Sequence, residues 1–295
     1  MSSKIKQLYS NKIIKNLEPF ICENIQYETI MGSTAYGVSS ESSDVDLYAF
    51  TIPPKGYVFP HTVGFIPGFG KNPPNFNVYQ EHHIQHNDKE YDVAVYGIVK
   101  YFSLLMDNNP NLIDSLFTRD QSVTYASKIG QMVKDNRSIF LHKGAWHRFR
   151  GYSYAQMKRM NNKKVDPDSK RYESIMKHGY DVKHAYHIIR LLDEVEQILS
   201  DYDIDLMKNN DQLISVRNGE WTLDEVEEYF KTKEKRLEQL YQDSTLQKYP
   251  DEEKIKQLLI NCLEEFYGTI SSSEVRLMSS AEVALNEIRQ VLEKY

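Results

Sequence analysis

The chain has 295 residues, of which 40% are hydrophobic and 26% charged, so we expect a folded protein of one large domain or two ordinary ones. Its formal net charge of −6 excludes a strongly basic polyanion-binding protein and weakens the case for extensive duplex binding. Two distant cysteines argue against a disulfide framework or a zinc site. There is no apolar run of membrane-helix length and no signal-peptide pattern, so we expect a cytoplasmic protein that does not contact the membrane.

The first fifty residues are predicted to contain one helix and two strands. Residues 3–20 have the apolar spacing of an amphipathic helix, and Ile25–Met31 is typical of a strand that ends at Gly32-Ser33. The serine-rich segment 33–43 is expected to form a turn or one short helix. Asp44–Thr51 is predicted to be the second strand.

Residues 53–77 contain six prolines and four glycines. This spacing predicts an ordered loop without a helix or a central strand. Long loops inside compact domains are commonly functional, so one interpretation is a lid over a ligand. The other is a variable surface insertion, and the sequence does not decide between them.

A hairpin and two helices are predicted after this loop. Tyr79–His86 and Lys89–Tyr96 alternate in polarity and are separated by a tight polar turn, which indicates two antiparallel strands. Helices are expected at Ile98–Met106 and Asn111–Phe117, the second capped by its own Asn111.

From about residue 121 onward the pattern is almost wholly helical, and no fixed-period repeat indicates a solenoid. The predicted fold is therefore α+β, with a mixed-sheet domain over residues 1–120 and a helical domain over residues 121–295 that completes the substrate cleft. The expected helices span residues 122–136, 144–162, 172–200, 223–241, 252–267 and 273–295.

Two aspartates one residue apart, Asp44 and Asp46, stand at the start of the second strand, where alternation points them to the same face. Like charges held this close repel unless a cation lies between them, and a divalent metal is the natural candidate. Gly32 and Ser33 just upstream supply backbone N–H groups and a hydroxyl that can hold phosphate oxygens. The stretch therefore indicates a site for a metal-bound nucleoside triphosphate; the alternative is a solvated turn, where Asp is common.

Phosphoryl transfer usually uses two metal ions about 4 Å apart, which need a further carboxylate from a neighbouring strand. Asp92, in a later apolar strand, is the best candidate for this third ligand. Glu90 shares its face and is the alternative. Asp92 would also help to deprotonate the attacking hydroxyl. The competing interpretation of Asp92 is an edge-strand carboxylate that faces water.

Lys183, His187 and Arg190 follow one another at helical spacing and form one polar face. They lie in a stretch, residues 143–190, that is basic inside an acidic protein. We expect contact with phosphate or acceptor, against the alternative of an ordinary solvated helix face. The histidines at 82, 83 and 86 favour a polar hairpin face over a zinc site.

Taken together, these motifs resemble the DNA polymerase β-like nucleotidyltransferase superfamily, and most closely the nucleotidyltransferases of bacterial and phage RNA-repair systems. The resemblance covers roughly residues 25–220 and departs at Thr34, where Arg is frequent, and at Asp114, where Glu is more usual. It rests on the segments Gly32–Gly37, Ser43–Leu47, Asp92–Tyr96, Tyr101–Leu105, Asn109–Asp114 and Lys183–Leu192.

The resemblance implies a mixed-sheet polymerase β-like nucleotidyltransferase domain that uses two Mg²⁺ ions, or Mn²⁺, and releases pyrophosphate from a nucleoside triphosphate such as ATP. It gives metal roles to Asp44, Asp46 and Asp92, and triphosphate binding to Gly32 and Ser33.

We therefore expect transfer of a nucleoside monophosphate to an acceptor hydroxyl, with an RNA end, on tRNA or single-stranded RNA, as the favoured acceptor. One alternative is nucleotidylation, such as AMPylation, of a protein or small molecule, which suits the acidic net charge. Another is a catalytically silent nucleotide- or RNA-binding module. The base, the acceptor and the oligomeric state stay open.

Overall fold

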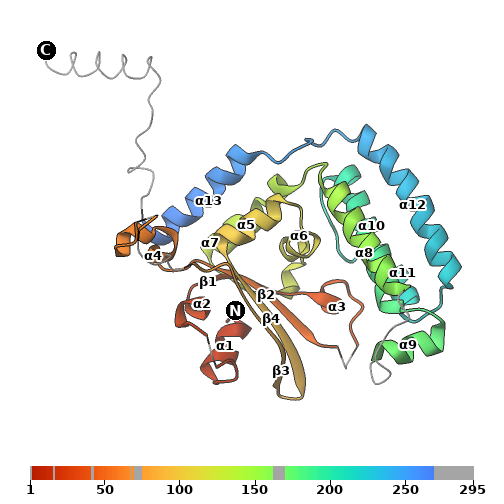
Figure 1. Cartoon of the computed structure of the whole chain (residues 1–295), viewed down its shortest axis with the longest axis horizontal. Coiled ribbons are helices and arrows are strands. Elements are labelled where there is room, and N and C mark those ends of the chain that lie inside the picture. The colour runs from red at the N-terminus through yellow and green to blue at the C-terminus, as the bar shows by residue number, and fades with distance from the viewer. Residues whose placement is uncertain are drawn as a thin grey trace, which may run out of the picture.

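A five-stranded mixed sheet, ordered β3-β4-β2-β1-β5, forms the centre of the molecule (Figure 1). The structure is a computed structural model that describes residues 2–15, 17–40, 43–66, 68–69, 75–161 and 170–268. β2 and β4 are parallel, and the other neighbouring strands are antiparallel. The predicted α+β class is confirmed. The strands are β1 (Ile25–Ile30), β2 (Val45–Thr51), β3 (Val78–His86), β4 (Lys89–Gly97) and β5 (Val123–Ala126).

Helices cover both faces of this sheet. On one face, α1 (Lys4–Ser10) and α2 (Pro19–Glu23) pack against Leu47 and Val93. The opposite face presents Phe50 and Tyr96 to a larger core. Because successive side chains alternate between faces, β2 and β4 contribute to both cores. Helices that contribute to the larger core include α5 (Ile98–Met106), α6 (Pro110–Phe117), α7 (Lys128–Asp135), α8 (Ala145–Met160) and α10 (Val182–Asp201).

The long helix α10 is the centre of the helical part. It packs against α8, α11 (Asn210–Arg217) and α12 (Leu223–Asp243), while α13 (Glu252–Tyr267) packs against α5 and α7. Figure 1 shows α8, α10, α11 and α12 grouped to one side of the sheet, with α9 (Lys170–His178) below them and near α3 (Gly32–Ala35). The helical part thus faces the sheet end where β2 begins.

Several predicted elements are confirmed to within a residue or two, among them β1, β2, α5, α8, α12 and α13. The hairpin is also confirmed, with Asn87 and Asp88 at φ angles of 50° and 58°. Two consecutive left-handed residues make the turn whose twist matches a two-stranded hairpin.

Other predictions were wrong. The helix expected over residues 3–20 is divided into α1 and α2, because the chain turns at Lys12 (φ 58°) and α2 begins at Pro19. The helix expected over residues 122–136 is β5 followed by α7, whose N-terminus is capped by Ser127.

The helix expected over residues 172–200 is likewise two helices, because α9 ends at His178 and the side chain of Asp181 caps α10. Asn109, rather than Asn111, caps α6, and Pro110 takes its first turn. α11 has no counterpart among the predicted helices.

The loop 53–77 does hold helical turns, contrary to expectation. α4 (Lys55–Val58) and a 3₁₀ turn (Pro60–Val63) both begin directly after or at a proline, where its fixed φ is suited to a first turn. Residues 67 and 70–74 lie outside the described residues, so a lid role stays a prediction. The helix expected over residues 273–295 also lies outside them.

The division into domains 1–120 and 121–295 stays a prediction, and the sheet takes β5 from beyond residue 120. Two further 3₁₀ turns, Asp120–Ser122 and Arg137–Phe140, flank β5 and α7. Within the described ranges, no helix combines the length and the apolar character needed to cross a membrane.

A buried carboxylate, Glu28, ties α1 to the sheet. It accepts hydrogen bonds from the backbone N–H of Lys4 (2.7 Å), from Thr124 Oγ1 (2.5 Å) and from the hydroxyl of Ser3. Glu28→Ala should therefore lower the free energy of unfolding by about 2–4 kcal/mol, because it leaves several buried donors unpaired. Urea denaturation measures this, with the exposed Glu23→Ala on α2 as the control. Equal stability of the two variants would contradict the prediction.

Candidate active site

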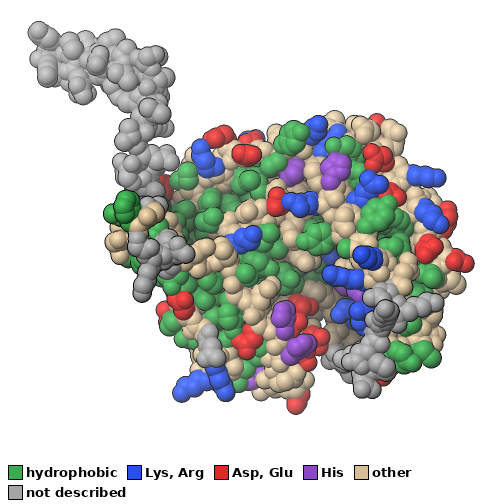
Figure 2. All heavy atoms as spheres, in the orientation of Figure 1, with side chains coloured by type: hydrophobic (Ala, Val, Ile, Leu, Met, Phe, Trp, Pro, Cys, Tyr) green, Lys and Arg blue, Asp and Glu red, His purple; other side chains and the backbone are tan. Residues whose placement is uncertain are grey.

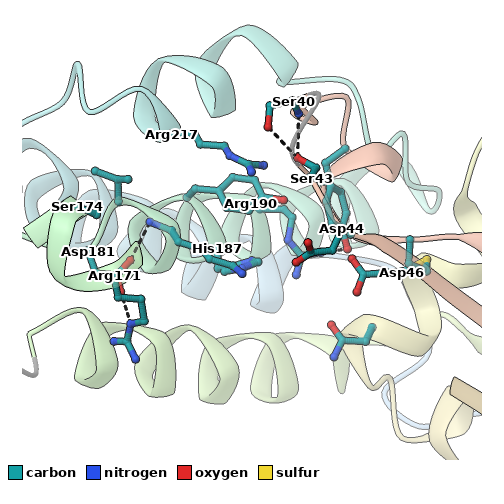
Figure 3. A pocket seen from close by; sticks show the side chains of 18 of the residues that line it. Ser40, Ser43, Asp44, Asp46, Arg171, Ser174, Asp181, His187, Arg190 and Arg217 are labelled. Atoms are coloured by element: carbon teal, nitrogen blue, oxygen red, sulfur yellow. Dashed lines mark hydrogen bonds and ion pairs between the residues drawn. The ribbon is translucent and has the colours of Figure 1, made fainter. Parts of the chain in front are cut away.

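A cavity of about 530 Å³ lies between the sheet and the helical part. In Figure 3, Asp44 and Asp46 lie at one end and Arg171, Ser174 and Asp181 at the other. Figure 2 shows Lys and Arg side chains gathered at this hollow, across from acidic and histidine side chains. The cavity therefore has an acidic side on the sheet and a basic side on the helices.

The acidic side is built by the parallel register of β2 and β4. Asp46 pairs directly with Asp92 across the two strands, so their side chains share one face. Asp44 is exposed, precedes β2 and lines the cavity with Asp46, whereas Asp92 lies beside the cavity on β4. The register thus brings Asp46 and Asp92 together, and Asp44 lies two residues before Asp46, directly ahead of the same strand.

Burial, and then the negative charge of Asp92, raise the pKa of Asp46 to about 6, and Asp44 adds to the rise. The positive charge of Lys183 acts in the opposite direction. A carboxyl group with this pKa is held in an environment that disfavours its ionised form. A divalent cation would relieve this repulsion, and carboxylate oxygens are the ligands that Mg²⁺ prefers. The chemistry of these oxygens therefore suits the predicted metal, although the ligand atoms of Asp44, Asp46 and Asp92 do not all lie within 4.8 Å of one another in the described structure.

Gly32 lets the backbone approach this carboxylate closely. Its φ is +61°, and a Cβ atom there would lie 1.8 Å from Asp46 Oδ2. No other residue fits this position without moving Asp46. Ser33 follows in the first turn of α3 and lines the cavity with Gly32. The predicted Gly-Ser and aspartate motifs are thus in direct contact.

The orientation of Asp92 is set by an irregularity in β3. The register of β3 and β4 shifts between Glu81 and Ile84. At this bulge the backbone N–H of His83 donates to Asp92 Oδ1 (2.9 Å), and His82 Nδ1 lies 3.2 Å from Asp92 Oδ2. Both oxygens of Asp92 are therefore held from the β3 side.

Glu90, the alternative third ligand, is two residues nearer the hairpin turn. It bonds to the ring of His83 and accepts from Gln85 Nε2 (2.8 Å). In the part of the chain that the structure describes, His83, Glu90 and Asp92 are the group whose donor atoms come close enough to hold a metal, all within 4.8 Å. Asp92 rather than Glu90 is in register with Asp46.

All three predicted residues of α10 line the cavity, but in different states. Arg190 is buried and forms ion pairs with Asp114 and with Glu194 (3.0 Å), so its charge is compensated. Desolvation and the nearby Arg190 and Lys183 cations lower the pKa of His187 well below its usual value, which keeps the imidazole neutral at pH 7. The Lys183 ammonium has no ion pair with any described residue.

Sequence reasoning missed several lining residues. Arg171 pairs with the buried Asp181 (2.6 Å), whereas Arg217, at the end of α11, donates to the backbone oxygen of Val38 (2.8 Å) and has no carboxylate partner among the described residues. The signal for Asp181 was its place before a periodic helix, which is typical of an N-cap. Arg217 gave no comparable signal, because α11 is short and was not predicted.

Three polar atoms that belong to lining residues are buried and have no hydrogen-bond partner in the described structure. They are Tyr186 Oη, Arg190 Nε and Ser174 Oγ. A buried polar group without a partner is costly unless a ligand or water pairs with it. Each of these atoms is closed to solvent, so they lie in the wall of the cavity behind its open surface.

The model of the RNA repair pathway DNA polymerase beta family matches residues 9–261 of the chain. Among solved structures, the chain is similar to a nucleotidyltransferase-like protein from Exiguobacterium sibiricum 255-15, at 11% identity and a TM-score of 0.29. That match covers 88% of this chain and 80% of the other. The comparison with curated proteins gave no match.

The raised pKa of Asp46 predicts a stability cost at neutral pH. Its usual value is 3.8, so the folded chain disfavours ionisation, and the cost develops as pH rises from about 4 to about 6 and is complete above that. Asp46→Asn should raise the free energy of unfolding by about 2–3 kcal/mol near pH 7.5 with a chelator present, and by little near pH 4.

Urea denaturation at both pH values tests this prediction. The exposed Asp44→Asn is the matched control and should change stability by less than about 0.5 kcal/mol. An Asp46→Asn variant that is less stable than the wild type near pH 7.5 would contradict the assigned cause.

Proposed function

The chain belongs to the RNA repair pathway DNA polymerase beta family and is a nucleotidyltransferase, and from this premise we propose that it transfers a nucleoside monophosphate from a nucleoside triphosphate to a hydroxyl at an RNA end. Pyrophosphate is the other product. The base of the donor is left open.

The main support for the proposal is the charge of the cavity, which is negative on one side and positive on the other, as a metal-bound triphosphate requires. Asp44 and Asp46 line its sheet side, and Lys183 and Arg217 line its helical side without carboxylate partners among the described residues. A metal ion matches the first side and phosphate oxygens match the second. A neutral ligand would leave both sides uncompensated.

The roles of the sheet residues follow from their positions. Asp44, Asp46 and Asp92 would hold divalent metal, Mg²⁺ or Mn²⁺, and Gly32 and Ser33 would present the backbone and a hydroxyl to the triphosphate. Divalent cations bound there would offset the charge that develops on the phosphate oxygens during transfer. Asp92, which the β3 bulge orients, would accept the proton of the attacking hydroxyl.

The α10 residues would contact the donor in distinct ways. Lys183 would supply an uncompensated charge, and its proximity to the carboxylates, seen in its lowering of the pKa of Asp46, supports this role. His187 is neutral and can donate a single hydrogen bond to a phosphate or ribose oxygen. The charge of Arg190 is already compensated by Asp114 and Glu194, and its Nε is unpaired but closed to solvent, so Arg190 would act on the donor mainly through the shape of the cavity wall.

The family description and the basic stretch 143–190 support an RNA acceptor. Part of that charge is compensated, since Arg148 pairs with Asp107 and Arg150 pairs with Glu234. Lys158, Arg159 and Lys177 are exposed and have no ion pair with a described residue. Exposed cations of this kind contribute a salt-dependent attraction to phosphates.

Asp44→Asn and Asp46→Asn should each lower labelled-nucleotide transfer by at least about 100-fold, because each removes a charged metal ligand at the reacting phosphate. Asp92→Asn should have a similar effect, and Glu90→Gln a smaller one. Circular dichroism and thermal melting serve as checks that each variant is folded. Transfer near the wild-type rate in the folded Asp44 or Asp46 variant would contradict the metal-ligand role of that residue.

The acceptor is tested by supplying each radiolabelled triphosphate with Mg²⁺ and offering tRNA, single-stranded RNA and total protein in parallel. Label on RNA, lost when the 3′-hydroxyl is blocked, supports the proposal. Label on protein would favour nucleotidylation of a protein instead. Triphosphate binding without pyrophosphate release from any acceptor would favour a silent binding module.

A further inference from the structure

α11 holds the backbone of the loop that follows α3. Asn210 Nδ2 donates to the carbonyl oxygens of Tyr36 (3.0 Å) and Gly37 (2.7 Å), and Arg217 donates to that of Val38 (2.8 Å). Three consecutive carbonyl groups are thus bound by one helix. We call these contacts the α11 clamp.

The clamp packs closely against Gly37 in this loop. Gly37 has a φ of +67°, and a Cβ atom there would lie 2.3 Å from Asn210 Nδ2 and 2.4 Å from Met207 Cε. The loop continues from Gly32 and Ser33, and the backbone N–H of Val38 donates back to the oxygen of Ser33 (2.9 Å). The position of α11 therefore bears on the position of the Gly-Ser motif.

The positive charge of Arg217 is not neutralised by the clamp, because the clamp bonds it only to a backbone oxygen. A guanidinium has five N–H donors, and its bond to Val38 engages one nitrogen. The group lies 6.0 Å from the ring of Tyr186 and contributes to the lowered pKa of His187, so it is close to both cavity residues. Figure 3 shows the side chain extending towards the middle of the cavity.

The other arginines that line the cavity are occupied. Arg171 is paired with Asp181, and Arg190 with Asp114 and Glu194. Of the four cationic side chains in the described lining, this leaves Lys183 and Arg217 to bind an anion. Arg217 is the one with a planar fork that can hold two phosphate oxygens at once.

We propose that Arg217 binds the pyrophosphate portion of the donor, its β- and γ-phosphates, while it holds Val38. This rests on the proposed function. The reacting α-phosphate belongs with the carboxylates, so the remaining phosphates extend to the uncompensated cations. A donor bound in this way links α11 to the loop and stabilises the Gly-Ser motif in its observed position, and the site selects triphosphates over monophosphates.

Inorganic pyrophosphate with Mg²⁺, titrated into the full chain by calorimetry, tests the proposal without knowledge of the base. Arg217→Gln removes the charge and, because its side chain is shorter, also the bond to Val38, and it should weaken pyrophosphate binding about 10- to 100-fold. Arg217→Lys should restore part of the affinity. Asn210→Ala removes the other two hydrogen bonds of the clamp but keeps the charge of Arg217. Compared with Arg217→Gln, it should weaken pyrophosphate binding less and lower kcat more.

Arg236→Gln, an exposed arginine of α12 outside the cavity, is the matched control and should bind pyrophosphate as the wild type does. Wild-type affinity in Arg217→Gln, or no pyrophosphate binding by the wild type, would overturn the proposal. Equal loss in Arg217→Gln and Asn210→Ala would assign Arg217 a loop-holding role alone and would also overturn it. Failure of RNA labelling, with the pyrophosphate result intact, would instead overturn only the proposed acceptor.

Discussion

A single buried guanidinium joins the elements that enclose the cavity. Arg190, from α10, is bonded to Asp114 on α6, to Glu194 one turn along α10, and to the hydroxyl of Tyr36 in the loop after α3. Burial raises the pKa of both Asp114 and Glu194, so these carboxyl groups depend on the arginine for their ionised forms. Breaking a buried pair from one side typically costs about 3–5 kcal/mol. Arg190 thus fixes the width of the cavity as well as lining it.

The sheet contributes a second constraint, which acts through backbone hydrogen bonds. The β2–β4 ladder places the carboxylates of Asp46 and Asp92 side by side although they repel, and the close approach at Gly32 adds burial to the repulsion. The chain accepts this local cost because the two cores of the sheet stabilise the strands that impose it. Strain of this kind, concentrated where a charged ligand belongs, is typical of a functional site.

Features with a local signature could be predicted from the sequence. Alternation over eight residues defined the hairpin, and helical periodicity defined α5, α8, α12 and α13. β5 could not be recognised, because its four residues, three half-buried and one exposed, are too few to show a period and owe their structure to pairing with β1. The break before Asp181 did have a signal, a glycine two residues before a capping aspartate, which the strong periodicity on both sides obscured.

The same distinction holds for the site. Asp44, Asp46, Gly32 and Ser33 are close in sequence, so their motif could be recognised as a unit. Arg217 meets Val38 across 179 residues, and this contact arises only from the packing of α11 against the rest of the helical part. Likewise, the charge of Arg190 is neutralised and that of Lys183 is not, and this difference depends on a partner from another helix, Asp114.

The bulge of β3 has a consequence for the behaviour of the protein in concentrated solution. β3 is one of the two edge strands of the sheet, and an open strand edge is a template on which another chain can add by hydrogen bonding. At His82 and His83 the strand departs from a regular ladder, and the amide of His83 is already bound to Asp92. The kink that orients a carboxylate therefore also interrupts this edge, and it disfavours the addition of another chain along β3.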